Sequence, residues 1–238
     1  MDEAKSLVEE HKMERQEILQ AIKTVKSNST KRKFTESVDF IINLKGLNIK
    51  KEEEKVSAFI PIPHFRGKKV TTTALVDQAL STKAKASCDH VILLDDFKKQ
   101  DKKSIRKLAV KTDYFIAQAN IMPKVAATFG RALGPKGKMP NPKAGCVVQP
   151  TAELQPLVER LQKLIRLETK NEPTIKTSIG MASMTDEHLA DNAMAIYNYI
   201  VSHVPQEKNN IKSIMLKLTM GTPIKLGENA VKVEASKK

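Results

Sequence analysis

The chain has 238 residues and a formal net charge of +14, from 41 lysines and arginines against 27 aspartates and glutamates. It contains no run of about 18 apolar residues, so no membrane span is predicted, and its charged N-terminus, MDEAKSLVEEHKMERQ, lacks the apolar core of a secretory signal. The excess of positive charge indicates a polyanionic partner, with a merely basic protein as the alternative.

Residues with special chemistry are few and scattered. There are no tryptophans, three tyrosines and seven phenylalanines, so contacts to phosphates and to RNA shape are favoured over stacking on bases. Cys88 and Cys146 lack metal-ligand spacing and indicate a reduced, cytoplasmic setting. We predict neither a metal nor a cofactor, because the histidines form no cluster in the sequence: His11, His64, His90, His188 and His203.

The first part of the chain predicts one helix and two strands. Residues 2–26 begin with acidic and end with basic side chains, as the helix dipole prefers. Residues 55–63, KVSAFIPIP, predict a strand that is closed by prolines. Between them, VDFIINLK alternates in the way that is typical of a half-buried strand, and one face carries Val38, Phe40, Ile42 and Leu44.

The middle of the chain alternates strands and helices. A strand at 70–75 is followed by a helix to about residue 86, and the apolar run in CDHVILLDDF, 88–97, is typical of a strand buried on both faces. A basic helix or loop, 98–111, precedes a short strand in TDYFIAQAN and a helix in MPKVAATFGRAL. Such alternation predicts an α/β unit with a partly parallel sheet.

The last part predicts two helices and two extended segments. PTAELQPLVERLQKLI, 150–165, has a helical pattern, and TIKTSIGMASM is extended. Thr185 is placed to cap the next helix, which Pro205 ends. SIMLKLTMG, 213–221, is a strand. The helix after Thr185 carries an apolar stripe of Leu189, Ala193, Ile196, Ile200 and Val204.

The segment LGPKGKMPNPKAGCVV, 133–148, is rich in proline and glycine and contains no acidic residue. A Walker phosphate loop is excluded because Met139 follows Gly137-Lys138, Ala132 occupies the first glycine position, and Pro135 lacks a backbone donor. A secondary role in touching RNA stays open for its lysines, which are Lys136, Lys138 and Lys143.

Other polar segments allow two interpretations each. Asp95–Asp96 ends a predicted strand and could bind magnesium, although a solvated turn is favoured. Phe34 follows three cations and could stack on a base or lie in the core. Residues 98–111 hold seven basic residues against one acid, which is a solvated face or part of a field that steers RNA. TMGTP, 219–223, could contact RNA or simply end a strand.

Three stretches together resemble a known family: KRKFTESVDFIINLK, LGPKGKMPNPKAGCVV and KLTMGTPIKL. The chain resembles the universal ribosomal protein of the lateral stalk, number one in the large-subunit series, in its archaeal form. This resemblance implies an α/β fold of two domains joined by a two-strand hinge. An α+β domain is built from residues 1–65 and 157–238, and residues 66–156 form a Rossmann-like insertion.

The resemblance also implies a function and a binding surface. Members of the family bind large-subunit rRNA in the mobile stalk, help to release deacylated tRNA from the exit site, and in several cases repress translation of their own messenger. We therefore expect a cytoplasmic, ribosomal chain that is monomeric off the ribosome and is not an enzyme. The RNA-binding residues implied are Lys33, Phe34, Ser37, Lys170, Lys176, Lys217, Thr219, Met220 and Gly221.

Near these positions, Arg166 and Glu168 lie on a neighbouring segment, and Met181 stands where bacterial members carry lysine, which makes a contact there doubtful. Two other classes stay open. One is an enzyme that uses a nucleotide, although KKVTTTALVDQAL has no glycine for a dinucleotide turn. The other is an RNA chaperone outside the ribosome.

Overall fold

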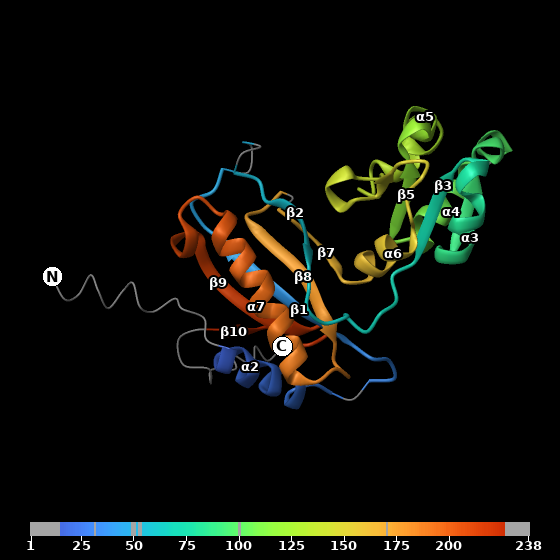
Figure 1. The fold of residues 1–238 in the computed structure, drawn as a ribbon. Coiled ribbons are helices and arrows are strands. Elements are labelled where there is room, and N and C mark those ends of the chain that lie inside the picture. The colour runs from blue at the N-terminus through green and yellow to red at the C-terminus, as the bar shows by residue number, and fades with distance from the viewer. Residues whose placement is uncertain are drawn as a thin grey trace, which may run out of the picture. The chain divides into compact units, whose positions relative to one another are not determined.

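The computed structural model describes residues 15–30, 32–48, 51, 54–99, 101–169 and 171–226. These residues form two compact units (Figure 1): one contains the described residues up to Lys68 and from Ile165 onward, and the other contains Lys69–Leu164. We call them the outer unit and the middle unit. Most of the predicted helix 2–26 lies outside the described residues, and its second half is α2, Arg15–Ser27.

The outer unit is built on an antiparallel sheet in the order β10-β9-β1-β8. Its central strand β1, Ser37–Leu44, joins β9, Ile211–Leu218, to β8, Thr174–Met181, and β10, Ile224–Leu226, forms the edge. The predicted alternation in β1 is confirmed, because every second side chain from Val38 to Leu44 is at most 2% exposed. β10 was not expected, since its three residues are too few to show a pattern.

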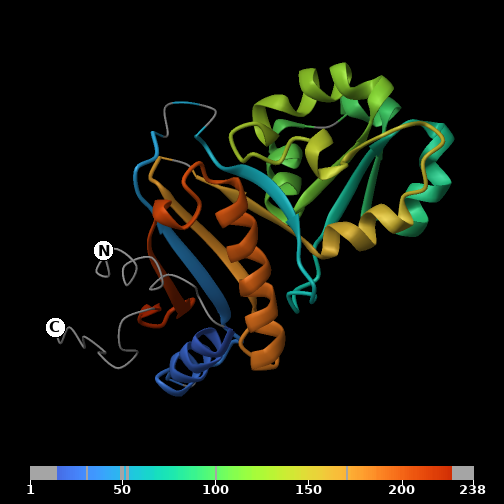
Figure 2. The same cartoon turned by 60° about the vertical axis from the view of Figure 1, so that its left-hand side comes forward.

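Two helices cover the buried face of this sheet. α2 and α7, Asp186–His203, contribute to one apolar core with β1, β8 and β9, and Figure 2 shows them beside the sheet. The apolar stripe predicted for α7 is confirmed by its burial, from Leu189 to Val204. Thr185 occupies the N-cap position as predicted, but its side chain makes no capping hydrogen bond.

A second, two-stranded sheet pairs β2, Ser57–Pro61, with β7, Leu164–Glu168. The sequence interpretation missed β7, because it extended one helix over 150–165. The structure ends that helix, α6, earlier: it runs over Gln155–Gln162. The leucines and isoleucine of LIRLE continue the apolar spacing of the helix, so the pattern alone did not show where the helix stops.

The middle unit has a parallel sheet in the order β4-β3-β5-β6. Its strands are β3, Thr72–Val76; β4, His90–Leu93; β5, Tyr114–Gln118; and β6, Val147–Val148. Its helices are α3, Ser81–Ser87; α4, Lys102–Lys111; α5, Met122–Leu133; and α6. The predicted α/β class, with one partly parallel sheet, is confirmed.

One prediction about this sheet is wrong. The apolar run of β4 was expected to be buried on both faces, but β4 is an edge strand whose side chains are exposed or half-buried. The fully buried strand is β3, which lies between β4 and β5. Neighbours on both sides, rather than the apolar run itself, decide which strand is enclosed.

Short 3-10 helices complete the chain. They are η1, Gln78–Leu80; η2, Leu94–Lys99; η3, Ala119–Ile121; η4, Pro142–Ala144; and η5, Glu207–Asn210. None of the described helices is both long and apolar enough to cross a membrane. The described residues also contain no group of three or more His, Cys, Asp or Glu side chains that could hold a metal ion.

The chain passes between the compact units at Lys68–Lys69 and at Leu164–Ile165. The sequence placed the domain boundaries at 65/66 and 156/157, and the second of these would divide α6. Because a boundary inside a helix would break its hydrogen bonds, we propose the passages at 68/69 and 164/165 as the domain boundaries.

Asn192 on α7 connects three segments of the outer unit. Its side-chain oxygen accepts a hydrogen bond from the backbone N–H of His64 at 3.0 Å. Its amide nitrogen donates to the carbonyl oxygens of His64 at 3.0 Å and of Ile179, on β8, at 2.9 Å. The Asn192 side chain is fully buried, so water cannot take its place as the hydrogen-bond partner of these backbone groups.

We therefore expect Asn192→Ala to lower the free energy of unfolding by about 3 kcal/mol, because three hydrogen bonds are lost and their partners stay buried. Urea unfolding of the full chain measures this loss. Asn198, exposed on the same helix, is the matched control, and Asn198→Ala should change the value by less than about 0.5 kcal/mol. Equal effects of the two variants would contradict the assigned role.

Candidate nucleic-acid interface

The face of the outer sheet that points away from α2 and α7 carries polar side chains in rows across the strands. Directly opposed residues of antiparallel strands share a face. The row at the start of β1 contains Ser37, and the next contains Asp39, which is opposite Lys217 on β9 and Ser178 on β8. A third row joins Ile41 to Met215 and Lys176. Predicted residues from three distant segments thus lie on one face.

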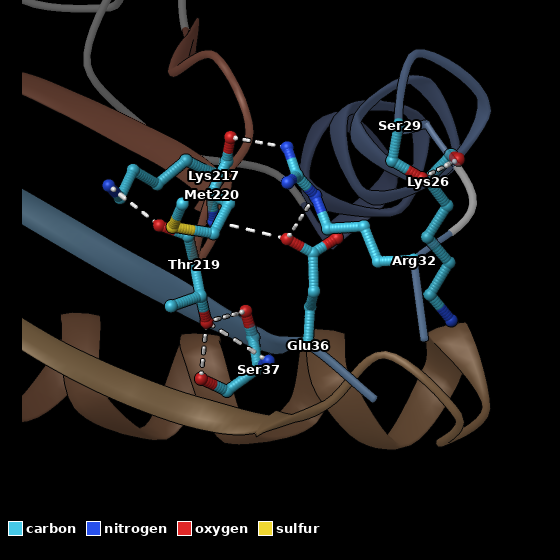
Figure 3. A network of polar contacts seen from close by, with 8 residues as sticks. All are labelled: Lys26, Ser29, Arg32, Glu36, Ser37, Lys217, Thr219 and Met220. Atoms are coloured by element: carbon cyan, nitrogen blue, oxygen red, sulfur yellow. Dashed lines mark hydrogen bonds and ion pairs between the residues drawn. The ribbon is translucent and has the colours of Figure 1, made fainter. Parts of the chain in front are cut away.

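A pair of hydroxyl groups joins the two chain segments at this end of the sheet (Figure 3). The side-chain oxygens of Ser37 and Thr219 lie 2.8 Å apart. The Thr219 hydroxyl also accepts from the backbone N–H of Ser37 and lies 3.1 Å from its carbonyl oxygen. The backbone N–H of Thr219 donates to that same carbonyl at 3.0 Å. Four contacts therefore hold the end of β9 against the start of β1.

A buried carboxylate fixes the next residue of the turn. Glu36 is 6% exposed and accepts a hydrogen bond from the backbone N–H of Met220 at 3.1 Å. Arg32 approaches the same carboxylate oxygen at 3.3 Å and donates to the Met220 carbonyl at 3.3 Å. Figure 3 shows the Arg32 and Glu36 side chains next to each other, on the same side of Met220. The backbone of this residue is thus held at both its donor and its acceptor.

The turn from Leu218 to Gly221 is closed by a hydrogen bond from the N–H of Gly221 to the carbonyl of Leu218, at 2.9 Å. A Cβ atom at position 221 would lie 3.2 Å from the Leu218 Cβ, which is a tight contact. Glycine lets the backbone fold back on the strand here. The fixed turn leaves the Met220 side chain projecting outward, and it is 61% exposed.

Phe34 lies two residues before Glu36 and is 54% exposed. The interpretation that it belongs to the core is therefore wrong. An exposed aromatic ring can stack on an unpaired base. Phe34 and Met220 are two of the four large hydrophobic side chains that are exposed among the described residues, with Phe65 and Val110.

The lysines differ in how free they are to bind. Lys33 is exposed next to Phe34. Lys217 is half-buried, and its ammonium lies 3.4 Å from the carbonyl of Thr219. Lys176 is exposed on β8, with Glu172 at 4.0 Å as a loose partner. Lys170 lies outside the described residues.

The other residues singled out in these segments have different settings. Arg32 is one of the three cations before Phe34, and it is committed to Glu36 and Met220. Lys31 lies outside the described residues. Arg166 and Glu168 are on β7, in the two-stranded sheet, and form an ion pair at 3.0 Å. Met181, by contrast, pairs with Ser37 at the end of β8.

Asp39 is the acidic residue in the second row of this face. Burial raises the pKa of its carboxyl group, while Lys217 opposite and a hydrogen bond from the Ser37 side chain oppose that rise. The ionised carboxylate of Asp39 therefore lowers the stability of the folded chain. It holds Lys217 and the hydroxyl pair in one polar network on the strand.

The predicted basic loop belongs to the middle unit, and its lysines have different roles. Lys138 is half-buried and donates from its ammonium to the carbonyl of Thr112, at the C-terminal end of α4. A cation there is favourable because the last carbonyls of a helix carry partial negative charge. Lys136 and Lys143 are exposed. Lys138 therefore contributes to the fold, and its contact with RNA stays a prediction.

The glycines of the same loop also have structural reasons. Gly137 has φ +62° and Gly145 has φ +76°, values that favour glycine. A Cβ atom on Gly134 would lie 2.7 Å from the Gly130 carbonyl oxygen. Asn141 caps η4 by accepting from the backbone N–H of Lys143 at 2.9 Å. The motif is therefore a sequence of turns that leads from α5 into β6.

Sequence reasoning missed Glu36 and the role of Arg32. The signal was present, because an acidic residue follows the cations of KRKFTES at i,i+4 spacing from the arginine. That spacing allows an ion pair in a helix, and here Arg32 and Glu36 form the ion pair in a segment that is not helical. The partner backbone at Met220 is 184 residues from Glu36 and left no local trace.

A two-unit α/β chain with a basic, hydroxyl-lined sheet end and an exposed aromatic ring has the chemistry of an RNA-binding protein. The model of the Ribosomal protein L1p/L10e family matches residues 23–222. The chain therefore belongs to this family, as predicted. The described surface lies almost entirely within the matched segment.

Archaeal relatives are similar over nearly their whole length. The chain is 38% identical over 216 residues to the large ribosomal subunit protein uL1 of Thermococcus kodakarensis, with 90% of this chain and 98% of that protein covered. It is 37% identical over 214 residues to the protein of the same name from Methanobrevibacter smithii, with 89% and 99% covered. The predicted resemblance to the archaeal form is confirmed.

We expect Asp39→Asn to raise the melting temperature at pH 7. The pKa of this group is raised in the folded state, so the carboxylate costs stability above the folded pKa, and the cost vanishes below the unfolded pKa of about 3.9. Thermal unfolding at neutral pH and near pH 3 should show a gain only at neutral pH. Asp101→Asn, at an exposed position, should show no such difference. A variant less stable than the parent at pH 7 would contradict the assignment.

Lys138→Met should lower the stability of the middle unit by about 1 kcal/mol, because the charged donor at the end of α4 is lost. Hydrogen exchange of α4 amides measures the loss locally. Lys143→Met, at an exposed position of the same loop, is the control and should have little effect. Unchanged exchange in the Lys138 variant would contradict its role in the fold.

Proposed function

We propose that the chain is a structural constituent of the large ribosomal subunit and binds rRNA of the stalk region through the end of its outer sheet. The observation that carries this proposal is the pair of exposed side chains, Phe34 and Met220, on a backbone fixed by Glu36 and Arg32. The names of the archaeal relatives support the ribosomal setting. A cytoplasmic location follows from that setting and is proposed with it.

The fixed turn suits recognition of a shaped RNA. Backbone groups held in place lose little freedom on binding, so their contacts contribute more to affinity. Phe34 supplies a ring for one base, and Lys33 and Lys176 supply charge for phosphates. The hydroxyls of Ser37 and Thr219 and the backbone at Gly221 suit contacts to ribose or phosphate oxygens. This surface thus suits recognition of the shape of the RNA rather than of a long base sequence.

Finer roles rest on the family resemblance. We propose that the chain helps to release deacylated tRNA from the exit site and represses translation of its own messenger through a similar RNA element. The second role needs no second surface, because a messenger with the same shape would occupy the same residues. If both RNAs bind the same surface, the rRNA fragment should displace a bound messenger fragment.

The alternative of a nucleotide-using enzyme has less support. A dinucleotide turn needs glycines between the first parallel strand and its helix. Between β3 and α3 the chain has Asp77 followed by η1, and the Asp77 side chain caps that short helix by accepting from the N–H of Gln78. The carboxylate is thereby directed at the backbone where a phosphate would bind.

Filter binding of a stalk rRNA fragment to the full chain tests the main proposal. Phe34→Ala should weaken binding by about tenfold or more, since a stacked base contributes about 1–3 kcal/mol. Met220→Asp should weaken it strongly through burial of a charge against phosphate, and Thr219→Val by loss of the hydroxyl pair.

The matched control is Phe65→Ala, which removes the other exposed phenylalanine of the outer unit. Lys83→Ala, at an exposed position of α3 in the middle unit, is the control for charge. Both should change the affinity by less than about threefold. Equal, small effects of all five variants would show that the surface is wrongly placed.

A further inference from the structure

The positive charge of the chain is concentrated in the middle unit. Residues 69–164 contain 17 lysines and arginines and 8 aspartates and glutamates, a formal net charge of +9 out of the total of +14. The surface proposed above lies in the outer unit. Most of the excess charge therefore has no role in that proposal.

Helix α4 carries the densest part of this charge. Five of its ten residues are basic and none is acidic, and all five are exposed: Lys102, Lys103, Arg106, Lys107 and Lys111. Within the part of the chain that the structure describes, none of the five forms an ion pair with a carboxylate. At 100° per residue, Lys103 and Lys107 point opposite to the buried Ile105 and Ala109, and Arg106 lies on the flank between the two faces.

This arrangement is unfavourable for the helix itself. Lys103 and Lys107 are like charges at i,i+4, as are Lys102 and Arg106, and each such pair costs about 0.2–0.5 kcal/mol. Lys102 and Lys103 also lie in the first turn, where the helix dipole disfavours cations. A helix selected for stability alone would carry acidic residues at these positions. The charges therefore indicate a binding role.

The basic loop continues the same surface. Lys138 ties its turn to the carbonyl of Thr112, at the C-terminal end of α4. The exposed Lys136 is in that turn, and Lys111 ends the helix. The structural role of Lys138 thus ties the turn that carries the exposed Lys136 to the C-terminal end of α4.

We propose that the exposed face of α4, with Lys103 and Lys107 at its centre and Arg106 at its flank, binds the phosphate backbone of a double-helical RNA segment. This inference rests on the proposed function for its choice of RNA as the polyanion. The described residues of the middle unit contain no exposed phenylalanine or tryptophan, so contact through phosphates is favoured over stacking. The apolar face of α4 is buried against α5, and Val110 is the single large apolar side chain that this helix exposes, which is too little to insert into a lipid surface.

Fluorescence anisotropy of the full chain with an RNA duplex of about 20 base pairs and arbitrary sequence tests the proposal, over about 50–200 mM salt. A triple variant carries Lys103→Gln, Arg106→Gln and Lys107→Gln. We expect it to bind about tenfold more weakly and to lower the slope of log affinity against log salt by about 2. A variant with Lys103→Arg and Lys107→Arg should bind as the parent does.

The matched control removes the same charge from other exposed positions of the middle unit, by Lys83→Gln, Lys85→Gln and Lys124→Gln. Its affinity should fall by less than about threefold. Equal losses in both triple variants would show that net charge alone binds the duplex, and no loss in the α4 variant would show that this face does not bind it. Either result overturns the proposal.

Thermal unfolding separates binding from folding. The α4 triple variant should melt at the same or a higher temperature, because like-charge repulsion is relieved. A lower melting temperature together with weaker binding would assign the cations to the fold and overturn the proposal. The result is also independent of the outer site, because Phe34→Ala with the stalk fragment tests that site alone, and failure of one assay leaves the other standing.

Discussion

The pairing of β1 with β9 is the interaction on which the outer unit and its candidate site depend. It joins segments that are about 180 residues apart in the chain, and the Ser37 and Thr219 hydroxyls meet only because of it. The same pairing aligns the apolar residues of both strands under α2 and α7, so one register serves the core and the surface. A shift by one residue would exchange the two faces of the strand and remove the site together with the core.

The site is organised by polar contacts that are themselves withdrawn from solvent. Glu36 is buried and holds the Met220 N–H, and Arg32 completes the contact at the Met220 carbonyl. The exposed side chains at this end of the sheet can contact a partner, and they are Phe34, Lys33 and Met220. The sheet end thus divides into residues that fix the backbone and residues that can bind. The middle unit repeats this division, since Lys138 fixes a turn while the cations of α4 stay exposed.

Much of the fold could be predicted because its signals are local. Alternation in β1 and the apolar stripe of α7 follow directly from the spacing of side chains, and the resemblance carried by GPKGKMPNPKAG and KLTMGTP identified the family. What could not be predicted depends on neighbours. β4 is an edge strand despite its apolar run, and β7 is hidden by the spacing of α6. The roles of Glu36, Arg32 and Lys138 need partners that are distant in the sequence, so no local pattern marks them.

Directed hydroxyl-radical probing from the turn at Met220 tests the central claim most directly. An iron chelate on Met220→Cys, in a background with Cys88→Ser and Cys146→Ser, cleaves nearby RNA when the chain is bound to large ribosomal subunits. The account predicts strand cuts confined to the stalk rRNA, and none there when the chelate is on Thr82→Cys in the middle unit. Stalk cuts from position 82 and none from position 220 would contradict it.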